Sequence, residues 1–226
     1  NHRAFLAGSG LGAPSATGQS RLLELTGTRR AFQLALDRPL GDRPHANQFW
    51  HPEVSASAVG FSVHRRVIDE GTGNDVSLLP GIYQARILIP QMRPGGGASV
   101  TSATNAVSVI MAPAITAVTL LGPRRYRFDV DGGYLARPPS STPTSDDLDI
   151  QLSVGGEIVP DIQVVTASPH TPPPPASQSA FEREADHFLV GLRGGGPIDD
   201  LAADNPLPVR LVIDGAEAPP TWIEAP

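Results

Sequence analysis

The residues best suited to chemistry in this chain are its histidines, acidic clusters and glycine turns. His45 and His51 are the closest histidine pair, but a spacing of six matches neither a helix face nor a zinc-ligand pair. The chain has no Cys, which excludes thiolate metal sites, disulfides and thiol nucleophiles. A metal centre is therefore not expected.

Two glycine-containing segments resemble ligand loops without completing the pattern. "GSGLGA" (8–13) matches the dinucleotide fingerprint, yet "PSATGQS" follows where a helix must receive the pyrophosphate. "DEGTGND" (69–75) is rich in oxygen ligands but lacks the terminal Glu of a calcium loop. We interpret both segments as ordinary turns and expect no cofactor.

The carboxylates of "SDDLDI" (145–150) and "EREAD" (182–186) offer pairs for acid/base work, which requires two groups facing a cleft. Their context favours solvated faces instead. No Ser lies in a Gly-x-Ser-x-Gly turn. We expect no enzyme; convergence of His45, His51 and an Asp would reverse that expectation.

Composition predicts an all-β chain. Gly (23) and Pro (24) make up about a fifth of the 226 residues, which is typical of short strands joined by many turns. Period-two alternation predicts thirteen strands. They span 3–9, 21–27, 31–37, 58–65, 81–90 and 105–112 in the first half, and 114–121, 125–132, 149–156, 157–167, 187–194, 207–215 and 221–225 in the second.

Charge and hydropathy exclude two classes of partner. The net charge of -6 argues against a general nucleic-acid binder or an anionic-membrane binder. No apolar run reaches the roughly 18 to 20 residues of a membrane span. The localisation stays open. Because the first residue is Asn, we expect the chain to be a piece of a longer protein.

A weak internal repeat divides the chain into two halves. "PGIYQARILIP" followed by "NAVSVIMAP" corresponds to "NPLPVRLVIDG" followed by "PPTWIEAP". A repeat of about 110 residues has the size of an immunoglobulin-like sandwich. We therefore predict two tandem sandwiches, residues 1–112 and 113–226, with a short link at Pro113 and a fairly fixed relative orientation.

Some segments depart from the strand pattern. "SPHTPPPPASQS" (168–179) is expected to be an extended loop, since consecutive prolines enter neither ladder nor helix. Ser179 and Glu182 fit a capping box, which predicts a short surface helix in "AFEREAD". "PIDDLAAD" (197–204) favours another helical turn.

Three stretches, "FLAGSGLGA", "LLPGIYQARILI" and "TNAVSVIMAPAITAV", resemble the pattern of IPT/TIG-type immunoglobulin-like domains. In the Pro-Gly-x-Tyr corner, Tyr83 is expected to bury its ring while its hydroxyl reaches backbone. Together with the ending "PVRLVIDGAEAPPTWIE", the chain resembles the carboxy-terminal part of cap or tail-terminator proteins of phage-tail-like contractile injection particles.

That resemblance implies a structural or docking module with protein partners, either sheath- and tube-type proteins or copies of itself. It also implies cytoplasmic assembly followed by association with the particle. The expected contact residues are Phe49, Trp50 and the prolines Pro172, Pro173, Pro174 and Pro175. The alternative is a secreted or surface carbohydrate-binding module that uses Trp50. Outside that alternative, Trp50 and Trp222 are both expected to be core or interface residues.

Overall fold

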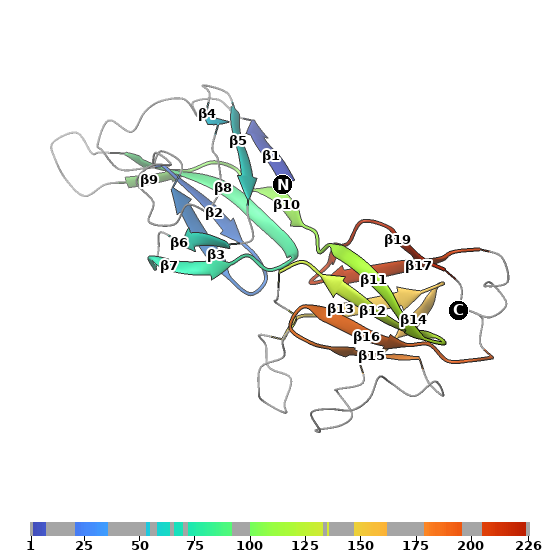
Figure 1. The fold of residues 1–226 in the computed structure, drawn as a ribbon. Coiled ribbons are helices and arrows are strands. Elements are labelled where there is room, and N and C mark those ends of the chain that lie inside the picture. Colours follow the sequence, from blue (N-terminus) through green and yellow to red (C-terminus); the bar gives the residue numbers. More distant parts are fainter. Residues whose placement is uncertain are drawn as a thin grey trace. The chain divides into compact units, whose positions relative to one another are not determined.

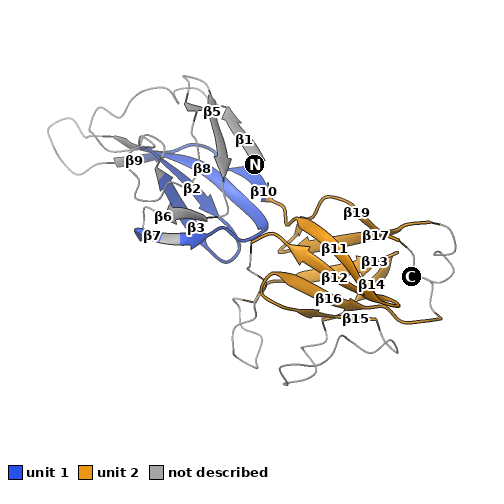
Figure 2. Ribbon diagram, viewed as in Figure 1, with its two compact units in different colours: residues 1–110 blue, residues 111–226 orange. Residues whose placement is uncertain are grey.

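A computed structural model of the chain describes residues 2–7, 21–35, 53–54, 58–63, 66–69, 72–91, 100–132, 135, 147–161, 179–195 and 205–224. Within these residues every regular element is a β-strand, in several antiparallel sheets, so the predicted all-β fold class is confirmed (Figure 1). The chain divides into two compact units, residues 1–110 and 111–226 (Figure 2).

The first unit contains strands β1 to β10. They are β1 (His2–Ala7), β2 (Leu22–Thr26), β3 (Ala31–Ala35), β4 (Glu53–Val54), β5 (Ala58–Val63), β6 (Arg66–Asp69), β7 (Asn74–Ser77), β8 (Gly81–Gln91), β9 (Val100–Ala103) and β10 (Val107–Met111). Strands β10, β8, β2 and β3 form one sheet, with β9 also on β8, while β1, β5 and β4 form another and β6 and β7 pair alone. Period-two alternation in the sequence did not predict the short strands β4, β6, β7 and β9.

Tyr83, the third residue of the long strand β8, closes a corner onto the chain before that strand. Its ring is buried, and its hydroxyl donates a hydrogen bond of 2.8 Å to the Leu79 carbonyl oxygen. The ring lies so close to Gly27 that a Cβ there would come within 2.8 Å of Tyr83 Cε1. The expected corner is therefore confirmed, and glycine at position 27 is required by a close approach.

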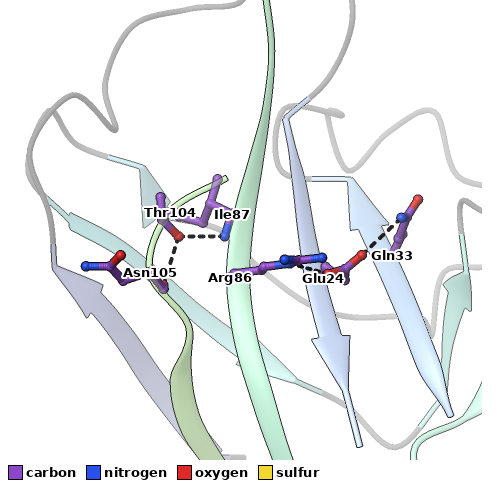
Figure 3. A network of polar contacts seen from close by, with 6 residues as sticks. All are labelled: Glu24, Gln33, Arg86, Ile87, Thr104 and Asn105. Atoms are coloured by element: carbon purple, nitrogen blue, oxygen red, sulfur yellow. Dashed lines mark hydrogen bonds and ion pairs between the residues drawn. The ribbon is translucent and has the colours of Figure 1, made fainter. Parts of the chain in front are cut away.

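Thr104 anchors the break between β9 and β10 to β8 (Figure 3). Its Oγ1 accepts a hydrogen bond from the Ile87 backbone N–H at 3.0 Å, and its own N–H donates to the Ile87 carbonyl oxygen at 3.0 Å. The Thr104 hydroxyl also donates to the Asn105 carbonyl oxygen at 3.1 Å. The strand can thus be interrupted without leaving the Ile87 amide unsatisfied.

Asp69 connects the described ends of "DEGTGND" to the rest of the sheet structure. Asp69 of β6 pairs with Asn74 of β7. Asp69 Oδ1 accepts from the Gln33 backbone N–H at 2.8 Å, and Oδ2 accepts from the Thr72 hydroxyl at 2.8 Å. This buried carboxylate therefore ties the hairpin to β3.

Strand pairing changes sheet at Pro113. β10 ends at Met111 in the sheet of β8, and the next strand, β11, starts at Ile115 in a different sheet. No strand runs through Pro113, which has no N–H for a ladder.

The second unit is a sandwich of two antiparallel sheets. Its strands are β11 (Ile115–Gly122), β12 (Arg125–Val130), β13 (Ile150–Val154), β14 (Glu157–Val159), β15 (Ala180–Arg183), β16 (His187–Gly191), β17 (Leu207–Ile213), β18 (Ala216–Glu217) and β19 (Thr221–Ile223). One sheet has the order β11-β12-β16-β15 and the other β14-β13-β17-β18, with β19 also on β17.

The core of this unit lies between the two sheets. Phe128, Phe181 and Phe188 are its largest fully buried side chains, and all three come from the first sheet. The Phe181 and Phe188 rings meet edge to face, with centroids 5.4 Å apart. The second sheet adds buried residues that include Leu152, Val154 and those of β17.

Two-residue turns close the hairpins of the second sheet. The Gly-Gly pair of "SVGGEIV" predicts a two-residue primed turn, because glycine takes the positive φ angles that such a turn requires. Gly155 and Gly156 both have positive φ between β13 and β14, which confirms this prediction. Asp214 and Gly215 do the same between β17 and β18, a hairpin that the sequence pattern missed.

The helix predicted from the capping box at Ser179 is wrong. Residues 180–183 form the strand β15, and all four are buried. Ser179 Oγ accepts a hydrogen bond from the Arg193 backbone N–H at 3.0 Å, so it holds a neighbouring segment instead of capping a helix. Pairing with β16 outweighs the local signal, because it buries Phe181 against Phe188. The turn predicted at 197–204 lies outside the described residues.

We predict that Tyr83→Phe lowers the free energy of unfolding of the first unit by about 1 kcal/mol, because it removes one hydrogen bond while keeping the ring. Denaturant unfolding measures the loss, and amide hydrogen exchange should place it around Leu79 and β8. Unchanged stability would show that the corner bond contributes nothing.

Candidate docking surface

The contact residues expected from the sequence, Phe49, Trp50 and Pro172 to Pro175, lie outside the described residues. The same holds for His45 and His51, so the expectation that they do not form a site with an Asp stays a prediction. The candidate surface below is therefore built from other residues.

The described titratable groups form pairs that orient side chains. His187 Nδ1 and Asp186 Oδ1 lie 2.7 Å apart at the start of β16, and this hydrogen bond lowers the pKa of Asp186. Among the residues that the structure describes, no group of three or more His, Asp or Glu side chains is placed to hold a metal ion. No helix in this part of the chain is long and apolar enough to cross a membrane.

A polar network on the first unit fits a structural role (Figure 3). Gln33, Glu24 and Arg86 face one another across β3, β2 and β8. Gln33 Nε2 donates to Glu24 Oε1 at 3.4 Å, and Arg86 forms an ion pair with Glu24. Strand register places both Gln33 and Arg86 opposite Glu24. These three side chains therefore help to align the neighbouring strands β3, β2 and β8.

Arg183 forms ion pairs while its own side chain is buried. Its Nη2 lies 2.9 Å from Asp147 Oδ1, and its Nε lies 3.5 Å from Asp161 Oδ2. The solvated-face prediction is wrong for Glu182, which is buried beside it, because this segment is a strand packed into the sandwich. Asp147 precedes β13, and Asp161 follows β14. Arg183 thereby connects both of these segments to its own strand, β15.

We predict that Arg183→Met lowers the free energy of unfolding of the second unit by about 2 kcal/mol, because Asp147 and Asp161 keep their charges without that partner. Thermal and denaturant unfolding measure the loss. Arg210→Met, which removes an exposed ion pair, is the matched control and should change stability little. Equal effects of the two variants would contradict this role.

The solvent-facing side of the second sheet in the second unit presents a mixed apolar and polar surface. Along β17, Leu207, Val209, Leu211 and Ile213 are buried, so the alternate residues face outward. We name this surface the outer face. It consists of Gln151, Ser153, Ile158, Pro208, Arg210, Val212, Glu217 and Trp222.

Two large apolar side chains of the outer face are strongly exposed. Ile158 is 77% exposed and Trp222 is 59% exposed, so Trp222 is not a core residue. Ile158 lies opposite Ser153, and Ser153 lies opposite Arg210. Trp222 lies opposite Pro208, on the far side of β17 from β13. The two apolar side chains therefore flank the centre of the face.

A groove of about 440 Å³ opens on the outer face next to Ile158. Its walls combine apolar and polar groups, among them Gln151, Ser153, Ile158, Pro160 and Arg210. A groove of this size and composition can accept one large side chain or a small ligand.

The charges on the outer face are paired. Arg210 Nε and Nη2 donate to the two carboxylate oxygens of Glu217 at 2.6 and 3.0 Å. The hydrogen bonds from Arg210 lower the pKa of Glu217, and those to Glu217 raise the pKa of Arg210. This two-bond geometry fixes both side chains and leaves the centre of the face close to neutral.

Alternation in "LPVRLVIDG" was the signal available for this surface, since it already places Pro208, Arg210 and Val212 on one side of a strand. Alternation does not show whether another layer of structure packs on that side of the sheet. Exposure of the surface could therefore be read only from the described fold.

No protein-family model matches the sequence, and neither does any curated protein.

Proposed function

We propose that this chain is a non-catalytic docking module of a larger protein assembly and that the outer face binds a protein partner. The observation that carries the proposal is the exposure of Ile158 and Trp222 on one ordered sheet face with Arg210 between them. Trp and Arg are enriched among residues that dominate protein interfaces. A sheet face also holds them rigidly, which reduces the entropy lost on binding.

We further propose that the assembly is a phage-tail-like contractile injection particle, with the chain in its cap or tail-terminator. This part of the proposal rests on the motifs around Gly81 to Tyr83 and on the ending after Pro208. The corresponding partners are sheath- or tube-type proteins, or further copies of the chain.

We predict that Trp222→Ala and Ile158→Ser each reduce retention of the full-length protein on purified particles, because each removes an apolar anchor. Quantitative mass spectrometry of wild-type and variant particles measures retention. Leu120→Ser is the matched control: Leu120 is 62% exposed in the other sheet of the same unit, and its variant should be retained normally. Full retention of both outer-face variants would contradict docking through this surface.

A second candidate function is carbohydrate binding, and the exposed ring of Trp222 is the observation that favours it. Trp222 lies opposite Pro208, two residues along β17 from Arg210. An exposed aromatic ring on a face that also carries polar groups is able to stack on a sugar while those groups bind its hydroxyls. Glycan-array binding abolished by Trp222→Ala or Trp50→Ala would support this function, whereas a flat array with the wild type would exclude the tested sugars.

A further inference from the structure

We infer that the second unit binds its protein partner by strand addition, in which an extended, uncharged segment of the partner pairs with β13 at Ile150. This inference rests on the proposed docking function and names the part of the partner that binds. Its basis is a position beside β13 that the short strand β14 does not fill. An added strand gains backbone hydrogen bonds, and its alternate side chains enter pockets on the sheet.

The backbone groups of Ile150 point away from β17. Alternate residues of an antiparallel strand bond to opposite neighbours. Gly155 N–H donates to the Pro208 carbonyl oxygen at 2.9 Å, and Asp214 N–H donates to the Asp149 carbonyl oxygen at 2.9 Å. Odd-numbered residues of this segment therefore bond toward β17. The even-numbered residues, Ile150 among them, direct their N–H and C=O groups to the side of β14.

Strand β14 ends before it reaches Ile150. It pairs with only three residues of β13. Continued pairing would place Asp161 opposite Ile150, but Asp161 forms a parallel bridge with Phe181 of β15. Phe181 N–H also donates to the Pro160 carbonyl oxygen at 2.8 Å, so the chain has turned to the other sheet by this point. Among the residues that the structure describes, none pairs with Ile150 on this side.

The groove of the outer face extends to this position. Its lining includes Ile150, Leu152 and Val159. The side chains of Leu152 and Val159 belong to the core, and that of Ile150 packs against the core. These three residues therefore present backbone atoms to the groove. Exposed backbone groups at strand spacing favour a partner that offers its own N–H and C=O groups at the same spacing.

The groove also determines which side chains the partner segment carries. Its lining is partly apolar and includes Ile158 and Val212. The two charged residues of the lining, Arg210 and Asp161, are each held in an ion pair. A charged side chain that entered the groove would lose water without gaining a counter-ion. The segment is therefore uncharged and mainly apolar.

Amide hydrogen exchange of the free full chain, followed by NMR, tests the unpaired position without any ligand. The Ile150 amide should exchange at least about tenfold faster than the amides of Gln151 and Leu152, which bond to β17 and β14. An Ile150 amide as protected as these neighbours would show that the position is already paired, and would overturn the inference.

Multivalent phage display of random dodecapeptides on the full chain supplies a peptide probe, because avidity enriches weak binders. Fluorescence polarisation of the synthetic peptide should give a dissociation constant of roughly 10 to 100 μM, since a short added strand forms few hydrogen bonds. Bound peptide should slow exchange of the Ile150 amide. A selection without an enriched peptide, or with peptides that leave this exchange rate unchanged, would contradict strand addition.

Two variants at one position isolate the backbone bond. Ile150→Pro and Ile150→Ala both lose the isoleucine side chain, but only the proline variant lacks the N–H. The dissociation constant of the peptide should be at least about fivefold higher for Ile150→Pro than for Ile150→Ala, which corresponds to one hydrogen bond. Circular dichroism checks that both variants fold. Equal dissociation constants would count against backbone pairing.

Methylation of single backbone nitrogens in the peptide tests the pairing on the wild-type chain, so this test needs no variant that folds. In strand addition only alternate residues of the peptide bond to β13. Binding should therefore weaken when alternate nitrogens are methylated and persist when the nitrogens between them are methylated. An equal response along the whole peptide would refute the proposed pairing.

The outcome is distinguishable from failure of the proposed function. If Trp222→Ala and Ile158→Ser leave the particle but Ile150→Pro is retained as well as Ile150→Ala, the outer face docks through side chains, and only the strand addition is wrong. If the peptide pairs with Ile150 but the Trp222 and Ile158 variants stay on the particle, the strand addition stands and docking to the particle uses another surface.

Discussion

The alternation of strand β17 is the constraint on which the second unit depends. Four of its side chains, Leu207, Val209, Leu211 and Ile213, are buried in the core between the two sheets. The same pleat must then direct Pro208, Arg210 and Val212 away from the core. Because β13, β18 and β19 all pair with β17, their outward residues are brought into register with these three. The outer face is thus a geometric consequence of filling the core.

Single polar side chains fix the turns and connecting segments that lie outside the strand ladders. Tyr83 fixes the start of β8, Thr104 bridges the gap between β9 and β10, and Asp69 joins a hairpin turn to β3. In the second unit, Arg183 joins β15 to the segments around Asp147 and Asp161. These contacts satisfy buried polar groups and position loops.

Strand periodicity predicted the all-β class and the main strands, since strands such as β12 and β17 bury alternate residues. The Tyr83 corner was expected from the resemblance to the Pro-Gly-x-Tyr pattern, and the Gly155-Gly156 turn from the positive φ angles that glycine can take. The segment at 180–183 was predicted to be a helix because of its local capping signal. It forms a strand because pairing with β16 buries its side chains, and that pairing is not visible in the local sequence. The outer face was missed because the exposure of Ile158 and Trp222 depends on what lies above the sheet.

The central claim is that the outer face is covered by protein when the chain associates. Hydroxyl-radical footprinting with mass spectrometry measures the solvent access of single side chains in dilute and associated samples. We expect the oxidation rate of Trp222 to fall on association while that of the equally exposed Leu120 stays constant. An unchanged rate at Trp222 in the associated sample would contradict the claim.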